Sequence, residues 1–370
     1  MTSSVVLISH SREVGGAEVH LERLIRDLVP KLGQIELVCR PDPVLDEWCR
    51  RIEQAGARVH RLALTNPSGF LRLRRILGRS RLVHLHLAHP VGKYQLVAAL
   101  AAGVMRRPAI ITHHLALQPA ELGVRGWQRW AWSRGLRMYR RLAARHIVIS
   151  QYAKSLLTTQ YGYDSQRLVV IYNGTDTDLF KPQPEGQAGG KTPLVLTVAR
   201  LTPQKGVMDL VDAARILLRD LPDTRFAVIG DGALRSTLEA AVAASQLDGH
   251  FEFLGARTPQ DIADWLRAAD VFVLPSHVEG GPAMALMEAM ASGCAVIATR
   301  VSGTDELVDE STGCLVPPQQ PPALAQAMVH LLNDPAGRAE LGRRARERVV
   351  ERFTLAASLA KTLELYRSML

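Results

Sequence analysis

PSHVEGGPAMALMEAMASG, residues 275–293, joins a short apolar run to a helical stretch through a Gly-Gly-Pro turn. A turn that leads into a helix aims unpaired backbone N–H groups at one point, and this suits a phosphate or a sugar hydroxyl. Glu279 stands before the turn, and Glu288 stands within the expected helix. Because the two carboxylates can accept hydrogen bonds from two ends of one polyhydroxylated ligand, the stretch predicts a nucleotide-sugar site.

Short apolar runs alternate with helical stretches on the N-terminal side of this segment and continue beyond it. Continuous apolar and β-branched runs are typical of buried parallel strands, and the helices between them supply the crossovers. The expected strands are Val5–Ile8, Ile35–Cys39, Val59–Leu62, Leu82–Leu87, Ala109–Thr112, His146–Ile149, Leu168–Ile171, Leu194–Val198, Arg225–Ile229, Phe251–Leu254, Val271–Leu274 and Ala295–Ala298. The pattern predicts an α/β protein with two doubly wound sheets, in which ligands bind at the carboxyl ends of the strands.

One segment without periodicity separates the two halves of this pattern. Residues 181–193 read KPQPEGQAGGKTP, and this Pro- and Gly-rich composition is typical of a linker. We therefore expect two Rossmann-like domains, over residues 1–180 and 194–352, that face an interdomain cleft. The final helical stretch, about residues 353–370, is expected to pack back on the first domain.

The composition is that of an ordinary globular protein, with 47% hydrophobic and 22% charged residues. No apolar run reaches the roughly 18 residues that span a bilayer, and the first residues lack the basic segment of a signal peptide. The four cysteines form no C-x-x-C pair, which disfavours a zinc site or a redox motif. Scattered thiols suit a reducing compartment, so we expect a cytoplasmic protein.

The net charge of +9 is distributed unevenly: residues 1–180 hold 26 basic and 13 acidic residues, and the later residues are slightly acidic. The segment Arg125–Lys154 contains no acidic residue and includes Trp127, Trp130 and Trp132. Basic residues interleaved with tryptophans suit docking on anionic lipid headgroups, here at the inner face of the cytoplasmic membrane. A solvated helix with inward tryptophans is the alternative. The acidic second half argues against nucleic acid as a partner.

Two cations follow the first strand of the second domain. Arg200 and Lys205 lie in VARLTPQKG, between that strand and a helix, so the loop can direct both toward the same cleft. Paired cations at a strand end suit a pyrophosphate and would stabilise the negative charge that grows as it departs. A pair of exposed loop charges is the alternative. Further on, Gly230 ends a strand in VIGDG, a pattern that many Rossmann-like strands share.

Glycines and polar residues also follow strands of the first domain. Gly15 and Gly16 form a loop in which the backbone can approach a ligand, or they simply begin a helix. His113 and His114 follow another strand and can donate to a sugar hydroxyl or a phosphate. Adjacent side chains in an extended segment point to opposite faces, so a metal held by both is not expected. The segment Asp176–Asp178 is expected to cap a turn.

In order along the chain, these segments resemble glycosyltransferase family 4, the retaining transferases of GT-B fold. The motifs are GGAE at Gly15, the histidine near residue 113, IVISQYAKS at Ile147, VIYNGTDTDLF at Val170, VARLTPQKG at Val198, VIGDG at Val228 and EGGPAMALMEAMASG at Glu279. The resemblance implies a retaining, metal-independent hexosyltransferase without a cofactor. Such an enzyme would move a sugar from a UDP- or GDP-linked donor to a hydroxyl of a lipid-linked saccharide or glycolipid, in cell-envelope polysaccharide synthesis.

The resemblance also implies a role for each candidate residue, with the donor on the carboxyl-terminal domain and the acceptor on the amino-terminal domain. Arg200 and Lys205 would grip the pyrophosphate, and Glu288 would accept from the ribose hydroxyls. Glu279 and His114 would contact the transferred sugar, with His113 as the alternative histidine. The remaining donor-binding candidates are Gly15, Gly16, Gly230, Gly281, Pro282, Ala283 and Met284. The leaving phosphate would take the acceptor's proton, so no protein base is needed.

One position departs from the family's usual signature, which has one residue fewer between its two glutamates. Eight residues separate Glu279 from Glu288. An extra helical residue would turn a side chain by about 100°, so we expect the loop Gly280–Ala283 to bulge and Glu288 to keep its facing. Two other functions stay open, a soluble transferase with a small-molecule acceptor and a non-catalytic GT-B scaffold. Retention of Arg200 and Lys205 argues against the scaffold.

Overall fold

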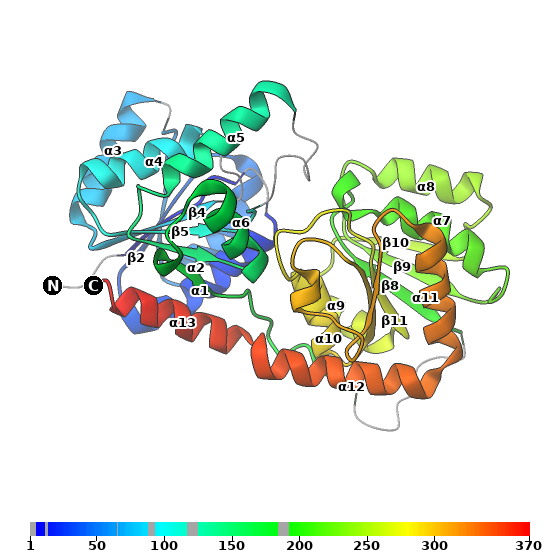
Figure 1. The fold of residues 1–370 in the computed structure, drawn as a ribbon. Helices are drawn as coiled ribbons and strands as arrows, with labels where there is room; N and C mark the ends of the chain where they lie inside the picture. Colours follow the sequence, from blue (N-terminus) through cyan, green and yellow to red (C-terminus); the bar gives the residue numbers. More distant parts are fainter. Residues whose placement is uncertain (1–4, 12–13, 65, 88–92, 117–124, 184–191) are drawn as a thin grey trace. The chain divides into compact units, whose positions relative to one another are not determined.

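The computed structural model divides the chain into two compact units, each built around its own sheet (Figure 1). It describes residues 5–11, 14–64, 66–87, 93–116, 125–183 and 192–370. The first unit comprises Met1–Asn173 and Ser358–Leu370, and the second comprises Gly174–Ala357. Most of the expected linker at 181–193 lies outside the described residues.

The first unit contains, in its described part, a seven-stranded parallel sheet of order β3-β2-β1-β4-β5-β6-β7. The strands are β1 (Val5–Ile8), β2 (Ile35–Cys39), β3 (Arg58–Arg61), β4 (Leu82–Leu87), β5 (Ala109–His113), β6 (Arg145–Val148) and β7 (Leu168–Val170). The order reverses between β1 and β4, because the chain returns to the middle of the sheet after building one edge. This reversal makes the sheet doubly wound, as the sequence predicted.

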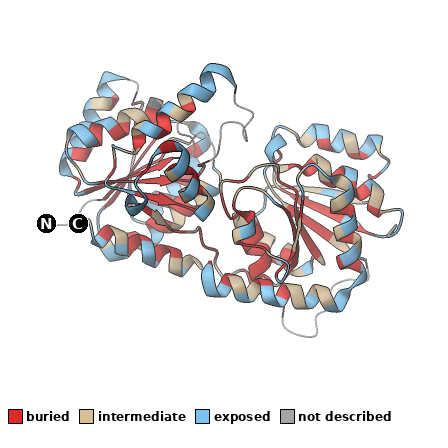
Figure 2. Cartoon of the chain, in the orientation of Figure 1, coloured by how far each residue is buried: buried red, intermediate tan, exposed pale blue. Residues whose placement is uncertain are grey.

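Helices cover both faces of this sheet and bury its apolar residues (Figure 2). They are α1 (Gly16–Leu32), α2 (Asp46–Gln54), α3 (Pro67–Arg79), α4 (Lys93–Val104), α5 (Gly126–Tyr139), α6 (Gln151–Tyr161) and most of α13 (Leu355–Arg367), with short 3₁₀ turns η1 (Pro43–Leu45) and η2 (Ser165–Arg167). On one face, Val6 and Val38 pack in the same cluster as Leu73 and Leu77 of α3. Burial of such alternate strand and helix faces supplies the main stabilisation of the unit.

The second unit repeats the architecture with a six-stranded parallel sheet, in its described part, of order β10-β9-β8-β11-β12-β13. The strands are β8 (Leu194–Val198), β9 (Arg225–Ile229), β10 (Phe251–Gly255), β11 (Val271–Leu274), β12 (Ala295–Thr299) and β13 (Cys314–Val316). The helices are α7 (Val207–Leu217), α8 (Arg235–Ala244), α9 (Pro259–Ala268), α10 (Met284–Ala291), α11 (Pro321–Asn333) and α12 (Pro335–Arg352), with turns η3 (Pro203–Lys205) and η4 (Thr304–Glu306). Here the order reverses between β8 and β11.

The boundary of the first unit falls at Asn173, seven residues before the position 180 that the sequence predicted. Residues 174–180 belong to the second unit because they pack on the end of α12. Thr175 forms a parallel bridge with Thr354, and the carbonyl of the buried Phe180 accepts from Arg346 at 3.1 Å. The sequence also did not predict the short strand β13.

The C-terminal helix α13 belongs from Ser358 onward to the first unit. Its buried Tyr366 hydroxyl lies 2.5 Å from Nδ1 of His84 on β4, and Nε2 of the same histidine lies 2.7 Å from Oγ1 of Thr112 on β5. The imidazole therefore links the last helix to two central strands.

Among the described residues, no helix combines the length and the apolar character that crossing a bilayer requires.

Buried histidines make the stability of the first unit depend on pH. Burial lowers the pKa of His84 to about 3 and that of His20 and His146 to about 4. The folded chain keeps these rings neutral, whereas the unfolded chain binds protons below about pH 6.5. The free energy of unfolding should therefore fall as the pH drops from about 6.5 to about 4, by about 1.4 kcal/mol per pH unit for each histidine.

Urea unfolding at a series of pH values, with hydrogen exchange of β4 and α13, measures this decline. His84→Gln should reduce the slope of unfolding free energy against pH by the contribution of one histidine, about 1.4 kcal/mol per pH unit. His330→Gln is the matched control, because His330 is exposed and its replacement should leave the slope unchanged. Equal slopes for the wild type and His84→Gln would contradict the assignment.

Candidate active site

The candidate site lies at the point where the strand order of the second unit reverses. The loop after β8 carries Arg200 and Lys205, and the loop after β11 carries Glu279. Because β8 and β11 are neighbours and parallel, both loops leave the same carboxyl edge of the sheet. Ligands of doubly wound sheets bind at such a reversal, because the two loops diverge there and leave a crevice.

Lys205 and Glu279 form an ion pair at this edge. Lys205 Nζ lies 2.5 Å from Oε1 of Glu279, and the side chains are 18% and 9% exposed. The same carboxylate oxygen accepts a hydrogen bond from the Ser276 hydroxyl at 2.7 Å. A largely buried pair of this kind needs such additional hydrogen bonds, because two charges removed from water lose much of their hydration. Arg200 lies on the same loop and is exposed.

Further contacts hold the two loops together. The His277 amide donates to the Gln204 carbonyl at 2.8 Å, and His277 Nε2 lies 2.8 Å from Oδ2 of Asp209. Gly206 has a φ of +61°, and a Cβ at this position would lie 2.0 Å from the Pro275 carbonyl oxygen. Only glycine permits so close an approach with this backbone conformation. The position of Lys205 is thus fixed by its neighbours in both loops.

The helix α10 begins at Met284, directly after the Gly-Gly-Pro turn. Its N-cap residue is Ala283, which has no side-chain acceptor, so no side chain caps the first amides of the helix. Gly281 and Pro282 are buried, whereas Ala283 and Met284 are half-buried. The residues Gly280–Ala283 lie outside the helix, which begins only after them. Glu288 lies within α10 and is 8% exposed.

Gly230 brings the ends of β8 and β9 together. A Cβ at Gly230 would lie 1.9 Å from the Ala199 carbonyl oxygen, and its amide donates to Gly255 at 2.9 Å. The glycine therefore serves the packing of three strand ends, and these contacts fix the backbone next to the Arg200 loop.

In the first unit, His113 and His114 point to opposite sides, as the sequence predicted for adjacent residues of an extended segment. His113, the last residue of β5, has its Nε2 3.3 Å from Nδ1 of His146. His114 has its Nε2 3.0 Å from Nδ1 of His86, and the two rings are stacked. Burial, and then the neighbouring histidines, hold the pKa of His86, His113 and His114 well below the usual value, so all three rings are neutral.

Two buried nitrogens of the His86–His114 pair face no partner within the described part of the chain, namely His86 Nε2 and His114 Nδ1. A buried ring nitrogen without a partner is costly unless a ligand or water satisfies it. His114 is therefore better suited than His113 to meet a ligand, because the Nε2 of His113 is engaged with His146.

The Gly15–Gly16 loop begins α1. The Gly15 amide donates to Glu18 Oε2 at 3.0 Å, so this amide is used within the chain and not offered to a ligand. Gly16 is exposed at the first position of the helix. Burial raises the pKa of the Glu18 carboxyl, and the Gly15 amide opposes this shift.

The Asp176–Asp178 segment forms a turn. Oδ1 of Asp176 accepts from the amides of Asp178 and Leu179 at 3.0 and 3.1 Å, so this carboxylate caps the turn, as expected. Within the described ranges, no group of three or more His, Cys, Asp or Glu side chains has an arrangement that could hold a metal ion.

Sequence reasoning missed three members of the site: Ser276, His277 and Asp209. Ser276 and His277 lie in the motif itself, only a few residues before Glu279. Asp209 lies in the first turn of α7, four residues after Lys205. Their proximity to the predicted residues was visible, but the pairing of His277 with Asp209 depends on the register of β8 against β11.

Two family models match the chain. The model "Glycosyltransferase Family 4" matches residues 14–179, and "Glycosyl transferases group 1" matches residues 192–334. An alpha-maltose-1-phosphate synthase of Mycolicibacterium smegmatis is 31% identical, over 96% of this chain and 96% of its own length. The chain belongs to glycosyltransferase family 4.

A further relative and a solved structure are also similar to this chain. A GDP-mannose-dependent alpha-(1-6)-phosphatidylinositol monomannoside mannosyltransferase of Mycolicibacterium smegmatis is 28% identical, over 94% of each chain. The crystal structure of HepE from Anabaena, in complex with UDP and glucose, matches with a TM-score of 0.83 at 21% identity, over 99% of this chain and 100% of that chain. The predicted GT-B fold is confirmed. As a member of family 4, the protein is a glycosyltransferase.

Replacement of Gly206 tests the close approach of the two loops. Gly206→Ala should destabilise the second unit by about 1–3 kcal/mol, because the Cβ meets the Pro275 carbonyl in a conformation that alanine rarely adopts. It should also weaken donor binding, since Lys205 precedes the glycine. Thermal unfolding and calorimetry with nucleoside diphosphates measure the two effects.

Gly249→Ala is the matched control, because a Cβ there meets no atom within 4 Å. If Gly206→Ala unfolds at the same temperature as the wild type and binds nucleoside diphosphates equally tightly, the two loops are not held together by this contact.

Proposed function

We propose that this protein is a retaining, metal-independent hexosyltransferase whose second unit binds a UDP- or GDP-linked sugar. Its acceptor is the hydroxyl of a lipid-linked saccharide or glycolipid, bound by the first unit, in cell-envelope polysaccharide synthesis. The reaction takes place at the inner face of the cytoplasmic membrane. The observation that carries the proposal is the Lys205–Glu279 pair at the reversal between β8 and β11.

The donor's charges match the groups that meet at this reversal. Lys205 and Arg200 provide cations for the pyrophosphate, and the first amides of α10 provide donors without a side-chain cap. Glu288, inside α10, accepts from the ribose hydroxyls. Glu279 accepts from a hydroxyl of the transferred sugar, and its bonds to Lys205 and Ser276 fix the carboxylate in place.

Transfer with retention requires the acceptor oxygen to attack the anomeric carbon on the face from which the phosphate leaves. In the proposed reaction, the C–O bond to the phosphate breaks as the new glycosidic bond forms, and the acceptor's proton passes to the departing phosphate oxygen. Lys205 and Arg200 stabilise the charge of this leaving group. His114, on the first unit, bonds a hydroxyl of the transferred sugar through the ring nitrogen that has no partner in the described chain.

The membrane part of the proposal depends on the helix α5. Trp127 and Trp130 are 75% and 64% exposed, whereas Trp132 is buried, so the inward packing considered from the sequence holds for one of three tryptophans. Arg134 lies over the Trp130 ring, 5.3 Å from its centroid. At spacings of three and four residues, these side chains share one face of the helix. Tryptophan and arginine on one exposed face suit the headgroup region of an anionic bilayer.

Removal of the pyrophosphate and ribose contacts tests the donor site. The double substitution Lys205→Ala with Glu279→Gln, and separately Glu288→Gln, should lower sugar transfer about 100-fold or more. Because Lys205→Ala alone leaves a buried carboxylate unpaired, the double substitution avoids a loss of folding. Transfer from UDP- and GDP-sugars and calorimetry with UDP and GDP are the measurements.

The thermal unfolding curve of each variant serves as the control for folding. If the wild type binds no nucleoside diphosphate more tightly than free phosphate, the proposed donor class is wrong. If the variants unfold at much lower temperature, these residues have a structural role instead.

Replacement of the exposed tryptophans tests membrane docking. Trp127→Ser with Trp130→Ser should lower cosedimentation with phosphatidylglycerol vesicles about tenfold, and high salt should weaken the wild-type binding. The exposed Val44→Ser is the control for loss of one apolar side chain elsewhere on the first unit. Salt-insensitive or absent wild-type binding would favour a soluble, small-molecule acceptor.

A further inference from the structure

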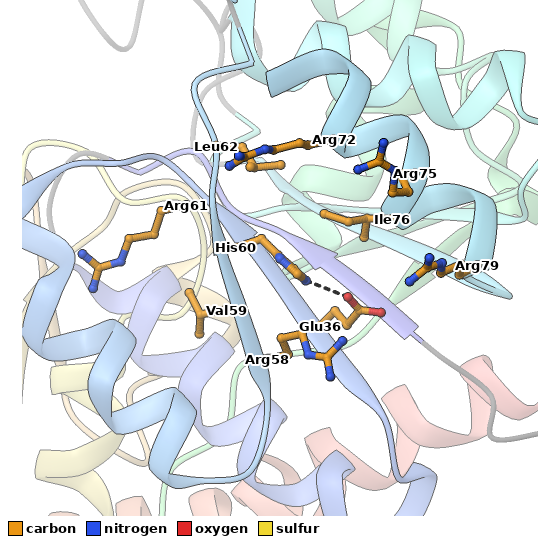
Figure 3. Close-up of a pocket in the computed structure, with 10 residues that line it drawn as sticks. All are labelled: Glu36, Arg58, Val59, His60, Arg61, Leu62, Arg72, Arg75, Ile76 and Arg79. Atoms are coloured by element: carbon orange, nitrogen blue, oxygen red, sulfur yellow. Dashed lines mark hydrogen bonds and ion pairs between the residues drawn. The ribbon is translucent and has the colours of Figure 1, made fainter. Parts of the chain in front are cut away.

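A polar pocket lies at the edge of the first unit's sheet, between the edge strand β3 and the helix α3 (Figure 3). Its volume is about 430 Å³. It is lined by Glu36, Arg58, Val59, His60, Arg61, Leu62, Arg72, Arg75, Ile76 and Arg79. No residue of the proposed donor site is among these, and all ten belong to the first unit.

The helix α3 presents arginines to this pocket. Arg72, Arg75 and Arg79 follow one another at spacings of three and four residues, and Figure 3 shows them along the side of α3 near β3. The apolar residues Leu73 and Leu77 of the same helix pack in the core. The helix thus buries an apolar stripe against the sheet and leaves a basic stripe at the sheet's edge.

The edge strand adds further positive charge. Arg58 is paired in register with Glu36 of β2, and His60 with Val38, so these four side chains share one face of the sheet. Val38 belongs to the same core cluster as Leu73 and Leu77, so this is the face that α3 covers. Arg61 points to the other side of β3, where it pairs with Asp46.

The acidic residue that lines the pocket is already engaged. Glu36 is buried, and its Oε2 lies 2.7 Å from His60 Nε2, which must donate because a carboxylate cannot. The sequence has no acidic residue between Glu53 and Glu121. Neither α3 nor the adjoining stretches of the sequence therefore supply a carboxylate that could pair with its arginines.

The pocket arginines largely lack partners. The side chains of Arg58, Arg72 and Arg75 form no hydrogen bond or ion pair with any other described residue. Guanidinium groups gathered around one cavity repel each other, and an anion at their centre removes this repulsion. Their planar forks match the oxygens of a phosphate in a bidentate arrangement.

We propose that this pocket binds a phosphate-bearing anion, at a site separate from that of the nucleotide sugar. Arg58, Arg72 and Arg75 supply the charge and the hydrogen-bond donors, and the Glu36 carboxylate orients His60 at the pocket floor. The volume accommodates a diphosphate or a phosphorylated headgroup, and Leu62 and Ile76 provide apolar contact for the rest of such a ligand.

Inorganic pyrophosphate, titrated by calorimetry into the full-length protein, tests this site. Because the donor site also has cations, two binding events are expected in the wild type. Arg72→Gln with Arg75→Gln should lose one event or weaken it at least about tenfold, since each arginine can supply a bidentate contact. Lys205→Ala with Glu279→Gln should keep that event and lose the other.

Arg74→Gln is the matched control, because Arg74 is an exposed arginine of α3 that does not line the pocket. Pyrophosphate binding that is the same in the wild type and in the Arg72 and Arg75 double variant would overturn the proposal. An equal loss of pyrophosphate binding in Arg74→Gln would also overturn it, because the loss would then follow from the change in net charge and not from the pocket.

Vesicles that contain phosphatidic acid distinguish the two sources of the phosphate. They are measured in the Trp127→Ser and Trp130→Ser background, so that contact through α5 does not contribute. Vesicle binding that depends on Arg72 and Arg75, and that pyrophosphate displaces, assigns the pocket to a lipid headgroup. Pyrophosphate binding without vesicle binding assigns it to a soluble phosphorylated compound.

Discussion

The buried ion pair between Lys205 and Glu279 is the constraint on which the candidate site depends. A lysine and a glutamate at this depth each need the other, because removal of one leaves an uncompensated charge away from water. The pair can form only where the loops after β8 and β11 meet, and that follows from the reversal of strand order between them. The fold therefore determines the arrangement here: a cation and a carboxylate are held side by side where the strand order reverses.

Most of the architecture could be predicted from the sequence, because buried parallel strands leave a strong local signal. The apolar runs Val5–Ile8, Leu194–Val198 and Val271–Leu274 are strands with the expected bounds. The Gly-Gly-Pro turn before α10 was also readable, since proline and glycine restrict where a helix can start. Family membership followed from the order of the motifs. The roles of the individual site residues still rest on the proposed function.

Features that depend on distant contacts could not be predicted. The pairing of His277 with Asp209 joins residues from two loops, and nothing local distinguishes that histidine from an exposed one. The boundary at Asn173 depends on a bridge between Thr175 and Thr354, which are far apart in the sequence. The arginine pocket requires that α3 lie along the edge strand. The sequence shows that the first half of the chain is basic, but it does not show that these arginines gather around one pocket.

The stacked pair of His86 and His114 has a further consequence for the direction of hydrogen bonding. Both rings are neutral, so the two facing nitrogens share one hydrogen. If His114 Nε2 holds it, His114 Nδ1 is an acceptor and His86 Nε2 a donor. If His86 Nδ1 holds it, both outer nitrogens exchange roles. The two ends of the pair thus always have opposite polarity. A group that can only donate, or only accept, at one end selects the tautomer, and with it the kind of partner that the other end accepts.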